Sequence, residues 1–379
     1  MWLLSNKDTK NYYLGMDMKK ALIILLFLCC AAALQSGARE RVSAADARIT
    51  YVGRCASSAD GSVSFDWSGV TVRIRFNGTG LSLDYADTKC DYFNVWIDRE
   101  PSEKEDFVVR AAGEGTLVLA QKLRKGEHSV VLQKRSEGEQ GRMTVRSLET
   151  DGSLLAASGL KARKIEFIGD SYTCGYGAEA AGRNEPFRTE EENCNLTYAA
   201  IAGRYFDADI QLVAHSGRGI IRNYGDGRSA LMPDRYPRTF DEDPDGGRWD
   251  ASRFVPDIVV IYLGTNDFST GKQPNLNAWC ANYRKLLRQI RDNYGDSVPV
   301  LCVASKADEL MGSYVEQAVL RSGIPNVHWT SIQESAHNNA SDLGADYHPN
   351  YAGHRKVASL VIPYIATLTG WEMPLEPYR

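Results

Sequence analysis

The sequence predicts an α/β protein in which an antiparallel β-sandwich of the jelly-roll kind precedes a three-layer α/β/α domain with a parallel sheet. Residues 48–150 alternate apolar and polar side chains with period two, and no convincing helix interrupts them. After a connector near residues 151–162, short runs rich in β-branched residues alternate with helical stretches. Many short strands favour a sandwich, whereas strand–helix alternation favours a doubly wound parallel sheet.

Length and composition fit this division. A chain of 379 residues is longer than one small core usually requires, and its 43% apolar and 24% charged residues are ordinary for a globular protein. The expected segments are a signal peptide at 1–38, the β-sandwich domain at 48–152 and the α/β domain at 160–375.

In the N-terminal part, Val70, Val72, Ile74 and Phe76 alternate with polar residues, as in a strand with one buried face. The turn residues 77–80 (NGTG) lead into a second alternating run at 81–85, which predicts a hairpin. Further strands are expected at 92–97, 116–120, 129–133 and 143–148.

In the C-terminal part, strands are expected at 164–168, 210–214, 258–263, 298–303 and 327–330. Helices are expected between or after them, at 196–205, 275–292, 308–321 and 351–368. Because the carboxyl ends of parallel strands meet at one edge of a sheet, residues that follow these strands should collect there.

The N-terminus resembles a secretory signal peptide, which predicts a secreted or periplasmic protein. Lys19 and Lys20 precede a 14-residue apolar run at 21–34, and small residues follow at 36–38. The run is shorter than the roughly 18–20 residues that span a bilayer, so no membrane span is expected. A lipid anchor on Cys29 or Cys30 is an alternative, which the bulky Leu28 disfavours.

Charge and cysteine content restrict the partners and metals. Residues 39–379 contain 40 Lys and Arg against 46 Asp and Glu, a net charge of −6 that does not favour nucleic acid. The six cysteines of this part form no CxxC pair, so a structural zinc site is not expected. Disulfides are possible after export, and nearest neighbours within one domain would be Cys55–Cys90 and Cys174–Cys194.

Polar clusters follow three of the predicted parallel strands, and a fourth precedes the last helix. They are residues 169–173 (GDSYT), 216–219 (SGRG), 264–267 (GTND) and 346–349 (DYHP). A serine hydroxyl is a weak nucleophile without a base, and His348 can supply that base for Ser171. The oxyanion formed by attack on a carbonyl needs hydrogen-bond donors. The backbone N–H groups of Ser171 and Gly217 and the side-chain amide of Asn266 are the candidates.

Two acidic residues in these clusters are assigned structural roles. Asp170 is expected to shape the turn that carries the nucleophile, and Asp267 is expected to bind local backbone, as Asp commonly does in turns.

These four blocks, in this order, resemble those of the SGNH hydrolase superfamily. The chain after residue 38 resembles carbohydrate esterase family 2 over nearly its whole length. The segments that carry this resemblance are GDSYTCGYG at 169–177, SGRGIIRNYG at 216–225 and LGTNDF at 263–268. The resemblance implies a jelly roll followed by a flavodoxin-like SGNH domain. It also implies a cofactor-independent serine esterase that deacetylates plant-type polysaccharides such as glucomannan, mannan or xylan through an acetyl-serine intermediate.

The third member of the catalytic group is left open by one departure from the superfamily pattern. That pattern is Asp-x-x-His, but here Ala345 lies three positions before His348 and Asp346 lies two before it. Either the Asp346 carboxylate orients the imidazole, which we favour, or a backbone carbonyl does so, as the resemblance also allows.

Candidate substrate-binding residues are Tyr347 and Tyr172, which flank the proposed base and nucleophile and could stack on a sugar, and Arg218, which could donate hydrogen bonds. The remaining histidines, including His354, show no metal-ligand spacing and are interpreted as core or capping residues. No metal site is expected.

Two other functions are compatible with parts of the pattern. A lipase-like or aryl esterase could use the same fold, although the polar stretch 222–253 argues against a lipid site. A catalytically inactive carbohydrate-binding protein is the second alternative, and the complete set of Ser171, Gly217, Asn266 and His348 argues against it.

Overall fold

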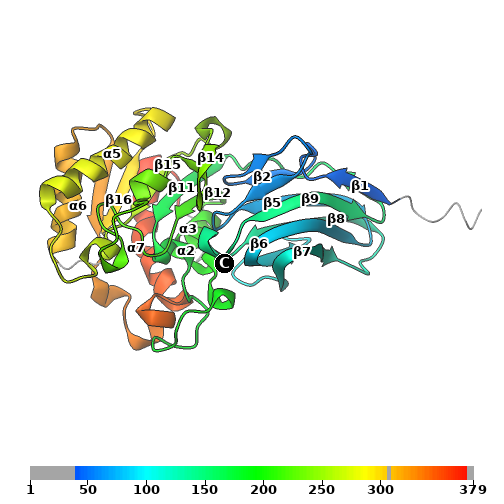
Figure 1. Cartoon of the computed structure of the whole chain (residues 1–379), viewed down its shortest axis with the longest axis horizontal. Helices are drawn as coiled ribbons and strands as arrows, with labels where there is room; N and C mark the ends of the chain where they lie inside the picture. The colour runs from blue at the N-terminus through cyan, green and yellow to red at the C-terminus, as the bar shows by residue number, and fades with distance from the viewer. Residues whose placement is uncertain (1–38, 305–308, 374–379) are drawn as a thin grey trace, which may run out of the picture. The chain divides into compact units, whose positions relative to one another are not determined.

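Two large β-sheets, one antiparallel and one parallel, carry the structure (Figure 1). The computed structural model describes residues 39–304 and 309–373, so the predicted signal peptide lies outside the described residues. Ten strands form the antiparallel sheet in the N-terminal part, and five form the parallel sheet in the C-terminal part. The change of sequence period therefore coincides with a change of sheet type.

All the strands expected in the N-terminal part are present, and every pairing among them is antiparallel. The expected strands at 81–85 and 92–97 are parts of one long strand, β6. The strands are β1 (Glu40–Ser43), β2 (Thr50–Val52), β3 (Ala56–Ser57), β4 (Val63–Phe65), β5 (Thr71–Gly78), β6 (Leu81–Ile97), β7 (Phe107–Ala120), β8 (Gly126–Lys134), β9 (Met143–Thr150) and β10 (Ser153–Leu155).

The expected jelly roll of two sheets is not confirmed, because β6 joins the strands into one curved sheet. Residues 81–87 of β6 pair with β9, residues 93–97 pair with β8, and β7 runs beside most of its length. The register with β7 shifts between Asp87 and Cys90, and such a bulge bends a strand and increases its twist. A period-two pattern reveals which face of a strand is buried but not which strands share a sheet.

The expected hairpin at residues 77–80 is also wrong, because β5 pairs with β2, β8 and β10 and not with β6. The carboxylate of Asp151 accepts hydrogen bonds from the N–H groups of Thr79 and Gly80, at 2.7 and 3.0 Å. A Cβ on Gly78 would lie 2.5 Å from Asp151 Oδ1. The turn therefore wraps around Asp151, and the chain continues into a different part of the sheet.

The parallel sheet has the order β12-β11-β15-β16-β17. Its strands are β11 (Arg163–Gly169), β12 (Ala208–Ala214), β15 (Ile258–Tyr262), β16 (Val300–Ala304) and β17 (Val327–Ser331). From β11 the chain first moves to β12 on one side and then crosses to β15 on the other. Doubly wound sheets bind their ligands at such a reversal, beside the carboxyl ends of the strands.

Helices cover both faces of this sheet and form the expected three layers. Apolar residues of α3 (Tyr198–Tyr205) and α7 (Tyr351–Thr369) pack with Ile258 and Val260 on one face. Apolar residues of α5 (Leu276–Tyr294) and α6 (Glu309–Ser322) belong to the core on the other face, with Val259 and Ile261. Within the described residues, no helix has the length and apolar character that a membrane crossing requires.

Buried ion pairs connect the antiparallel sheet to the parallel sheet. Arg54 donates to Glu166 of β11 at 3.2 Å, and both side chains are fully buried. Arg73 of β5 pairs with Asp209 of β12, where both side chains are also buried. Aromatic rings surround the Arg54 guanidinium, and some come from the segment between β12 and β15, which contains α4 (Met232–Arg235), β13 (Arg238–Phe240) and β14 (Asp243–Arg248).

Replacing Arg54 with alanine should destabilise the protein strongly, because Glu166 would remain buried without its cationic partner. Loss of one member of a buried pair typically costs about 3–5 kcal/mol. Arg41→Ala is the matched control, since Arg41 pairs with Asp84 at the surface and such a pair contributes about 1 kcal/mol or less. Urea unfolding of both variants measures the free energies. A loss in Arg54→Ala no larger than in Arg41→Ala would contradict this prediction.

Candidate active site

The candidate nucleophile Ser171 is the first residue of α2 (Ser171–Cys174), a single turn that directly follows β11. Asp170 is the N-cap of α2, and its carboxylate accepts a hydrogen bond from the backbone N–H of Tyr172 at 3.2 Å. The turn requires Gly169, because a Cβ there would lie 1.9 Å from Thr173 Oγ1. The chain therefore leaves the strand in a sharp turn that places Ser171 at the carboxyl edge of the sheet.

The candidate base His348 contacts Ser171 although 177 positions separate the two residues. Its Nε2 lies 2.9 Å from Ser171 Oγ, and its Nδ1 lies 3.1 Å from the carbonyl oxygen of Asp346. Because a carbonyl oxygen can only accept a hydrogen bond, Nδ1 carries the proton in this arrangement. Nε2 is then unprotonated and can accept the hydroxyl proton of Ser171.

The carboxylate of Asp346 is directed to another part of the site, so our preference for it as the third catalytic group is not supported. It accepts hydrogen bonds from the hydroxyl of Tyr176 at 2.9 Å and from the N–H of Phe187 at 3.2 Å. Asp346 and Tyr347 both have left-handed backbones, with φ of 49° and 62°. This conformation turns the carbonyl of Asp346, and not its side chain, toward the imidazole.

The three candidate oxyanion donors follow three neighbouring strands. Ser171 follows β11, Gly217 follows β12 and Asn266 follows β15. Gly217 has a φ of 75°, in the left-handed region that favours glycine. The side-chain amide of Asn266 donates to the carbonyl of Arg218 at 2.9 Å and to the carboxylate of Asp170 at 3.2 Å. Asn266 is thereby held between the other two turns.

Asp267 has the structural role that the sequence predicted. Its carboxylate accepts the N–H groups of Ile220, Ile221 and Arg222, at 2.9, 2.8 and 2.9 Å. Burial raises the pKa of Asp267 to about 6, against the opposing effect of these donors. The residue joins the turn that carries Asn266 to the loop after β12.

The three candidate substrate-binding residues have different surroundings. Tyr347 is 58% exposed and its hydroxyl donates to Asn184 at 3.1 Å, so its ring is available to a ligand. Tyr172 is a correction: it is 8% exposed, and its ring packs against His348 at 5.7 Å between centroids. The guanidinium of Arg218 lies 3.2 Å from His215 Nε2. The backbone carbonyl of Arg218 accepts a hydrogen bond from the side-chain amide of Asn266.

Two aromatic residues beside the base were missed by the sequence analysis. The ring of Tyr176 lies 4.3 Å from that of His348 and stacks on Phe187 at 4.2 Å. Burial and the bond to Asp346 raise the pKa of Tyr176, so its hydroxyl stays protonated and donates. Tyr176 lies within the block at 169–177 and Phe187 in the loop that follows it, but neither residue has a periodic pattern that would place it beside His348.

The other five histidines were expected to be core or capping residues, and three of them lie in the core. His354, His337 and His215 are buried, His128 is half-buried and His328 is exposed. Burial, together with two neighbouring imidazoles, lowers the pKa of His354 to about 3, so it is neutral at physiological pH.

The two suggested disulfides are absent, and all six cysteines of the described residues are free thiols. Cys174 and Cys194 instead donate S–H hydrogen bonds, to a carboxylate at 3.4 Å and to a backbone carbonyl at 3.3 Å. Proximity in sequence does not set the direction of two Cβ–S bonds, which a disulfide requires. Cys55 and Cys90 likewise do not form the suggested disulfide.

Two family models match two different parts of the chain. Residues 51–157 match the family model described as carbohydrate esterase 2 N-terminal. Residues 167–356 match that of the GDSL-like lipase/acylhydrolase family. The second match contains all of the candidate catalytic and oxyanion residues.

Two curated relatives are similar over most of this chain. The cellulase/esterase CelE of Acetivibrio thermocellus is 35% identical over 331 residues, which are 85% of this chain and 40% of CelE. The chain thus spans less than half of that relative. An acetylxylan esterase/glucomannan deacetylase of Cellvibrio japonicus is 28% identical over 87% of this chain and 91% of its own length.

Solved structures of family two carbohydrate esterases have a fold similar to that of this chain. A family two carbohydrate esterase from Clostridium thermocellum in complex with cellohexaose superimposes with a TM-score of 0.77 and 33% identity, over 86% of this chain and all of that chain. A family two carbohydrate esterase from Cellvibrio japonicus gives a TM-score of 0.79 and 26% identity, over 88% and 99%. Both parts of the sequence and the whole described fold match in the same order, so the chain belongs to carbohydrate esterase family 2, with a C-terminal domain of the GDSL-like lipase/acylhydrolase family.

Proposed function

We propose that this protein is a serine esterase that removes O-acetyl groups from plant-type polysaccharides such as glucomannan, mannan or xylan. The observation that carries the proposal is the 2.9 Å contact between Ser171 Oγ and His348 Nε2, with Nδ1 of the same ring bound to a carbonyl. The named activity of the Cellvibrio relative, acetylxylan esterase and glucomannan deacetylase, supports the acyl group and the substrate class.

The reaction begins when Ser171 Oγ attacks the acetyl carbonyl carbon while His348 Nε2 removes the hydroxyl proton. The carbonyl oxygen becomes an oxyanion, which the N–H groups of Ser171 and Gly217 stabilise. The amide of Asn266 joins them by exchanging its 3.2 Å bond to Asp170 for a bond to the oxyanion. The C–O bond to the sugar then breaks, and the sugar oxygen receives the proton from His348. Water, deprotonated by the same imidazole, then attacks the carbonyl carbon of the acetyl-serine. The bond from this carbon to Ser171 Oγ breaks, Oγ receives the proton from His348, and acetate leaves. These steps require only side chains and backbone groups of this chain.

Among the described residues, the group that binds Nδ1 of the imidazolium formed in each half-reaction is a backbone carbonyl. The Asp346 carbonyl keeps the Nδ1 proton in place, and the ring of Tyr176 lies beside the imidazole. A carbonyl dipole stabilises a cation less than a full negative charge does. The arrangement is therefore a Ser–His dyad with a backbone orienting group.

We propose that the acetylated sugar rests on Tyr347, the exposed aromatic ring next to the base. The guanidinium of Arg183 lies 5.4 Å from the centre of this ring, and Asn184 accepts its hydroxyl. An aromatic face packs against the apolar face of a pyranose, while neighbouring polar groups bind hydroxyls.

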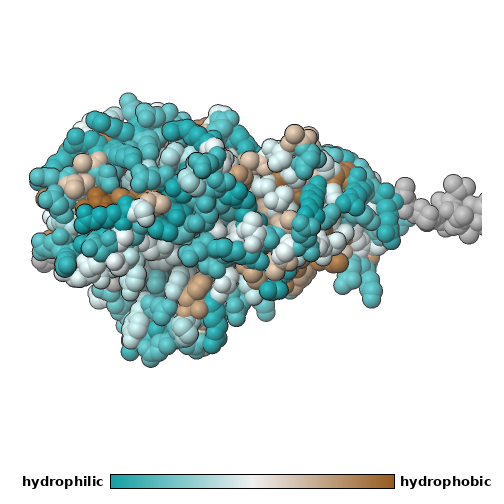
Figure 2. Space-filling model, viewed as in Figure 1, coloured by the Kyte–Doolittle hydropathy of each residue, from teal (hydrophilic) through white to brown (hydrophobic). Residues whose placement is uncertain are grey.

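The face of the molecule that Figure 2 shows favours a polysaccharide over a lipid as the substrate. The face of the molecule shown in Figure 2 is mostly hydrophilic, with small scattered apolar patches. A lipid-binding site would expose a contiguous apolar surface. The preserved contact between Ser171 and His348 likewise favours an active enzyme over a binding protein. Export through the N-terminal signal at 1–38 would bring the enzyme to such substrates.

Acetate release from acetylated glucomannan and acetylated xylan tests the proposed function. The wild-type protein should release acetate from at least one of them, and Ser171→Ala should lose at least about a thousandfold in turnover because the nucleophile is gone. Thermal unfolding of both proteins controls for folding. Faster turnover of long-chain fatty-acyl esters than of acetyl esters would identify a lipase-like enzyme and would reject the proposal.

The variant Asp346→Asn should retain turnover within about threefold, because the carbonyl that holds His348 is unchanged and an amide oxygen can accept the bond from Tyr176. A catalytic carboxylate would behave differently, since its conversion to an amide costs about ten-thousandfold in a Ser–His–Asp triad. Initial rates of acetate release decide between these values. A loss above a hundredfold would instead support a catalytic triad of Ser171, His348 and Asp346.

Tyr347→Ala should raise KM for the acetylated polysaccharide by about tenfold and leave turnover of a small acetyl ester unchanged, because the ring would contact only the glycan. Tyr364→Ala is the control: Tyr364 is also an exposed aromatic, at 44%, but belongs to α7. Equal effects of the two substitutions on KM, or a loss with the small ester, would place the glycan elsewhere.

A further inference from the structure

A loop of the antiparallel domain reaches beneath the candidate active site. It follows β8 and is held by Arg135, which is 1% exposed. Its Nε donates to the carbonyl of Glu192 at 2.9 Å, and its own carbonyl accepts the N–H of Cys194 at 3.1 Å. Close approach requires Gly138, where a Cβ would lie 2.7 Å from Asp241 Oδ2. These contacts fix the backbone on both sides of Glu137.

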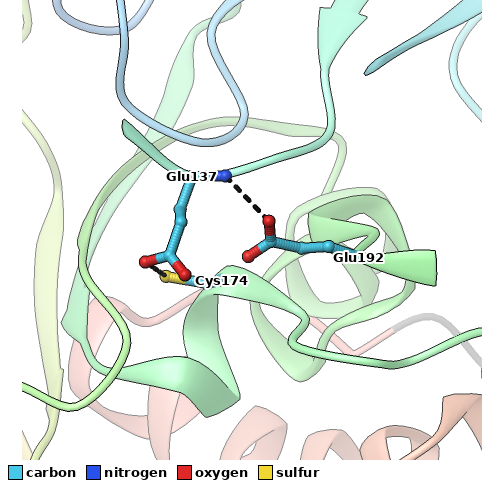
Figure 3. Close-up of side chains that lie close together, drawn as sticks. All are labelled: Glu137, Cys174 and Glu192. Atoms are coloured by element: carbon cyan, nitrogen blue, oxygen red, sulfur yellow. Dashed lines mark hydrogen bonds between the residues drawn. The ribbon is translucent and has the colours of Figure 1, made fainter. Parts of the chain in front are cut away.

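The side chain of Glu137 touches two elements of the proposed catalytic machinery at once. Its Oε2 accepts the N–H of Ser216 at 2.6 Å and the thiol of Cys174 at 3.4 Å, as Figure 3 shows for the thiol. Ser216 immediately precedes Gly217, the candidate oxyanion donor. Cys174 is the last residue of α2, the turn that begins with Ser171. One carboxylate oxygen therefore bridges the nucleophile turn and the oxyanion loop.

A second carboxyl group, that of Glu192, lies beside this bridge (Figure 3). Its Oε2 accepts the N–H of Glu137 at 3.1 Å. Burial and the neighbouring Glu137 raise the pKa of Glu192 well above its usual range, which favours the neutral form of this carboxyl group. Glu137 Oε2 accepts the N–H of Ser216 at 2.6 Å, a short distance that is typical of a strong hydrogen bond to a carboxylate.

The same three side chains could be considered as metal ligands, since their ligand atoms lie within 4.8 Å of one another. Their protonation argues against this. Cys174 and Glu192 would have to lose their protons to bind a metal ion, whereas burial raises the pKa of both groups well above its usual range in the metal-free site. The oxygen of Glu137 that faces the thiol is already bound by two donors.

We propose that Glu137, contributed by the N-terminal domain, is a positioning residue that aligns the oxyanion loop at Ser216–Gly217 with the nucleophile turn at Ser171. The inference rests on the proposed roles of Ser171 and Gly217. It makes the N-terminal domain a part of the catalytic apparatus and not only a neighbouring module. A carboxyl group at this point holds the N–H of Ser216 in one direction and so restricts the orientation of the next peptide group.

The test compares Glu137→Gln with Glu192→Gln, two equally conservative changes at buried positions. Glu137→Gln replaces the carboxyl group that accepts the bonds from Ser216 and Cys174 by an amide with a single acceptor oxygen. It should lower kcat by about tenfold to a hundredfold, with KM within about twofold, since misaligned oxyanion donors weaken only the transition state. Glu192→Gln keeps a side-chain oxygen that can accept the N–H of Glu137 and should stay within about threefold of wild type. A general loss of core packing would affect both variants alike.

Glu139→Gln serves as the surface control, because the Glu139 side chain is 59% exposed. Unfolding temperatures of all variants are measured beside the rates. If Glu137→Gln does not fold, Glu137→Asp keeps the carboxyl group but shortens the arm and should show the same selective loss of kcat.

The outcomes separate this inference from the proposed function. Acetate release by the wild type that disappears in Ser171→Ala establishes the function. Normal kcat in a folded Glu137→Gln or Glu137→Asp then overturns the positioning role alone. Equal losses in Glu137→Gln and Glu192→Gln, or a stoichiometric metal ion found in the wild type by mass spectrometry, would also overturn it.

Discussion

The position of β11 between β12 and β15 is the constraint on which the rest of the site depends. Parallel strands end at one edge, so the turns after these three strands place Ser171, Gly217 and Asn266 side by side. Each turn is then fixed by local bonds, such as the Asn266 amide to the carboxylate of Asp170. A different strand order would separate the same residues by whole strand widths of about 5 Å each.

Buried charge connects the two domains and thereby extends the site beyond the parallel sheet. Arg54 with Glu166, and Arg73 with Asp209, are ion pairs in which each domain contributes one partner. Unpaired, each of these charges would be costly to bury, so the two domains depend on one another for charge compensation. Glu137 also connects the two domains, and it does so beside the candidate catalytic residues. Its side chain accepts hydrogen bonds from an N–H and a thiol of the other domain.

The backbone at Asp346 and Tyr347 decides how the base is oriented. Two successive left-handed residues direct a carbonyl to His348 and send the carboxylate of Asp346 to Tyr176 and Phe187. Non-glycine residues adopt this conformation at a cost of order 1–3 kcal/mol each, and such strain tends to occur at functional sites. The aspartate is thus used to attach the aromatic loop beside the imidazole, while a peptide group orients the ring.

The amino-acid sequence by itself determined the elements of this protein and the chemistry available at the sheet edge. Periodicity located the five parallel strands and the four long helices, and the blocks around Ser171, Gly217, Asn266 and His348 followed because each adjoins a strand or helix end. Only the tertiary structure decided the sharing of β6 by both halves of the antiparallel sheet, the carbonyl at His348, the burial of Tyr172 and the reach of Glu137 beneath Ser216. Periodicity reports which faces are buried, whereas these features depend on backbone direction and on contacts between residues far apart in the chain, which no local pattern encodes.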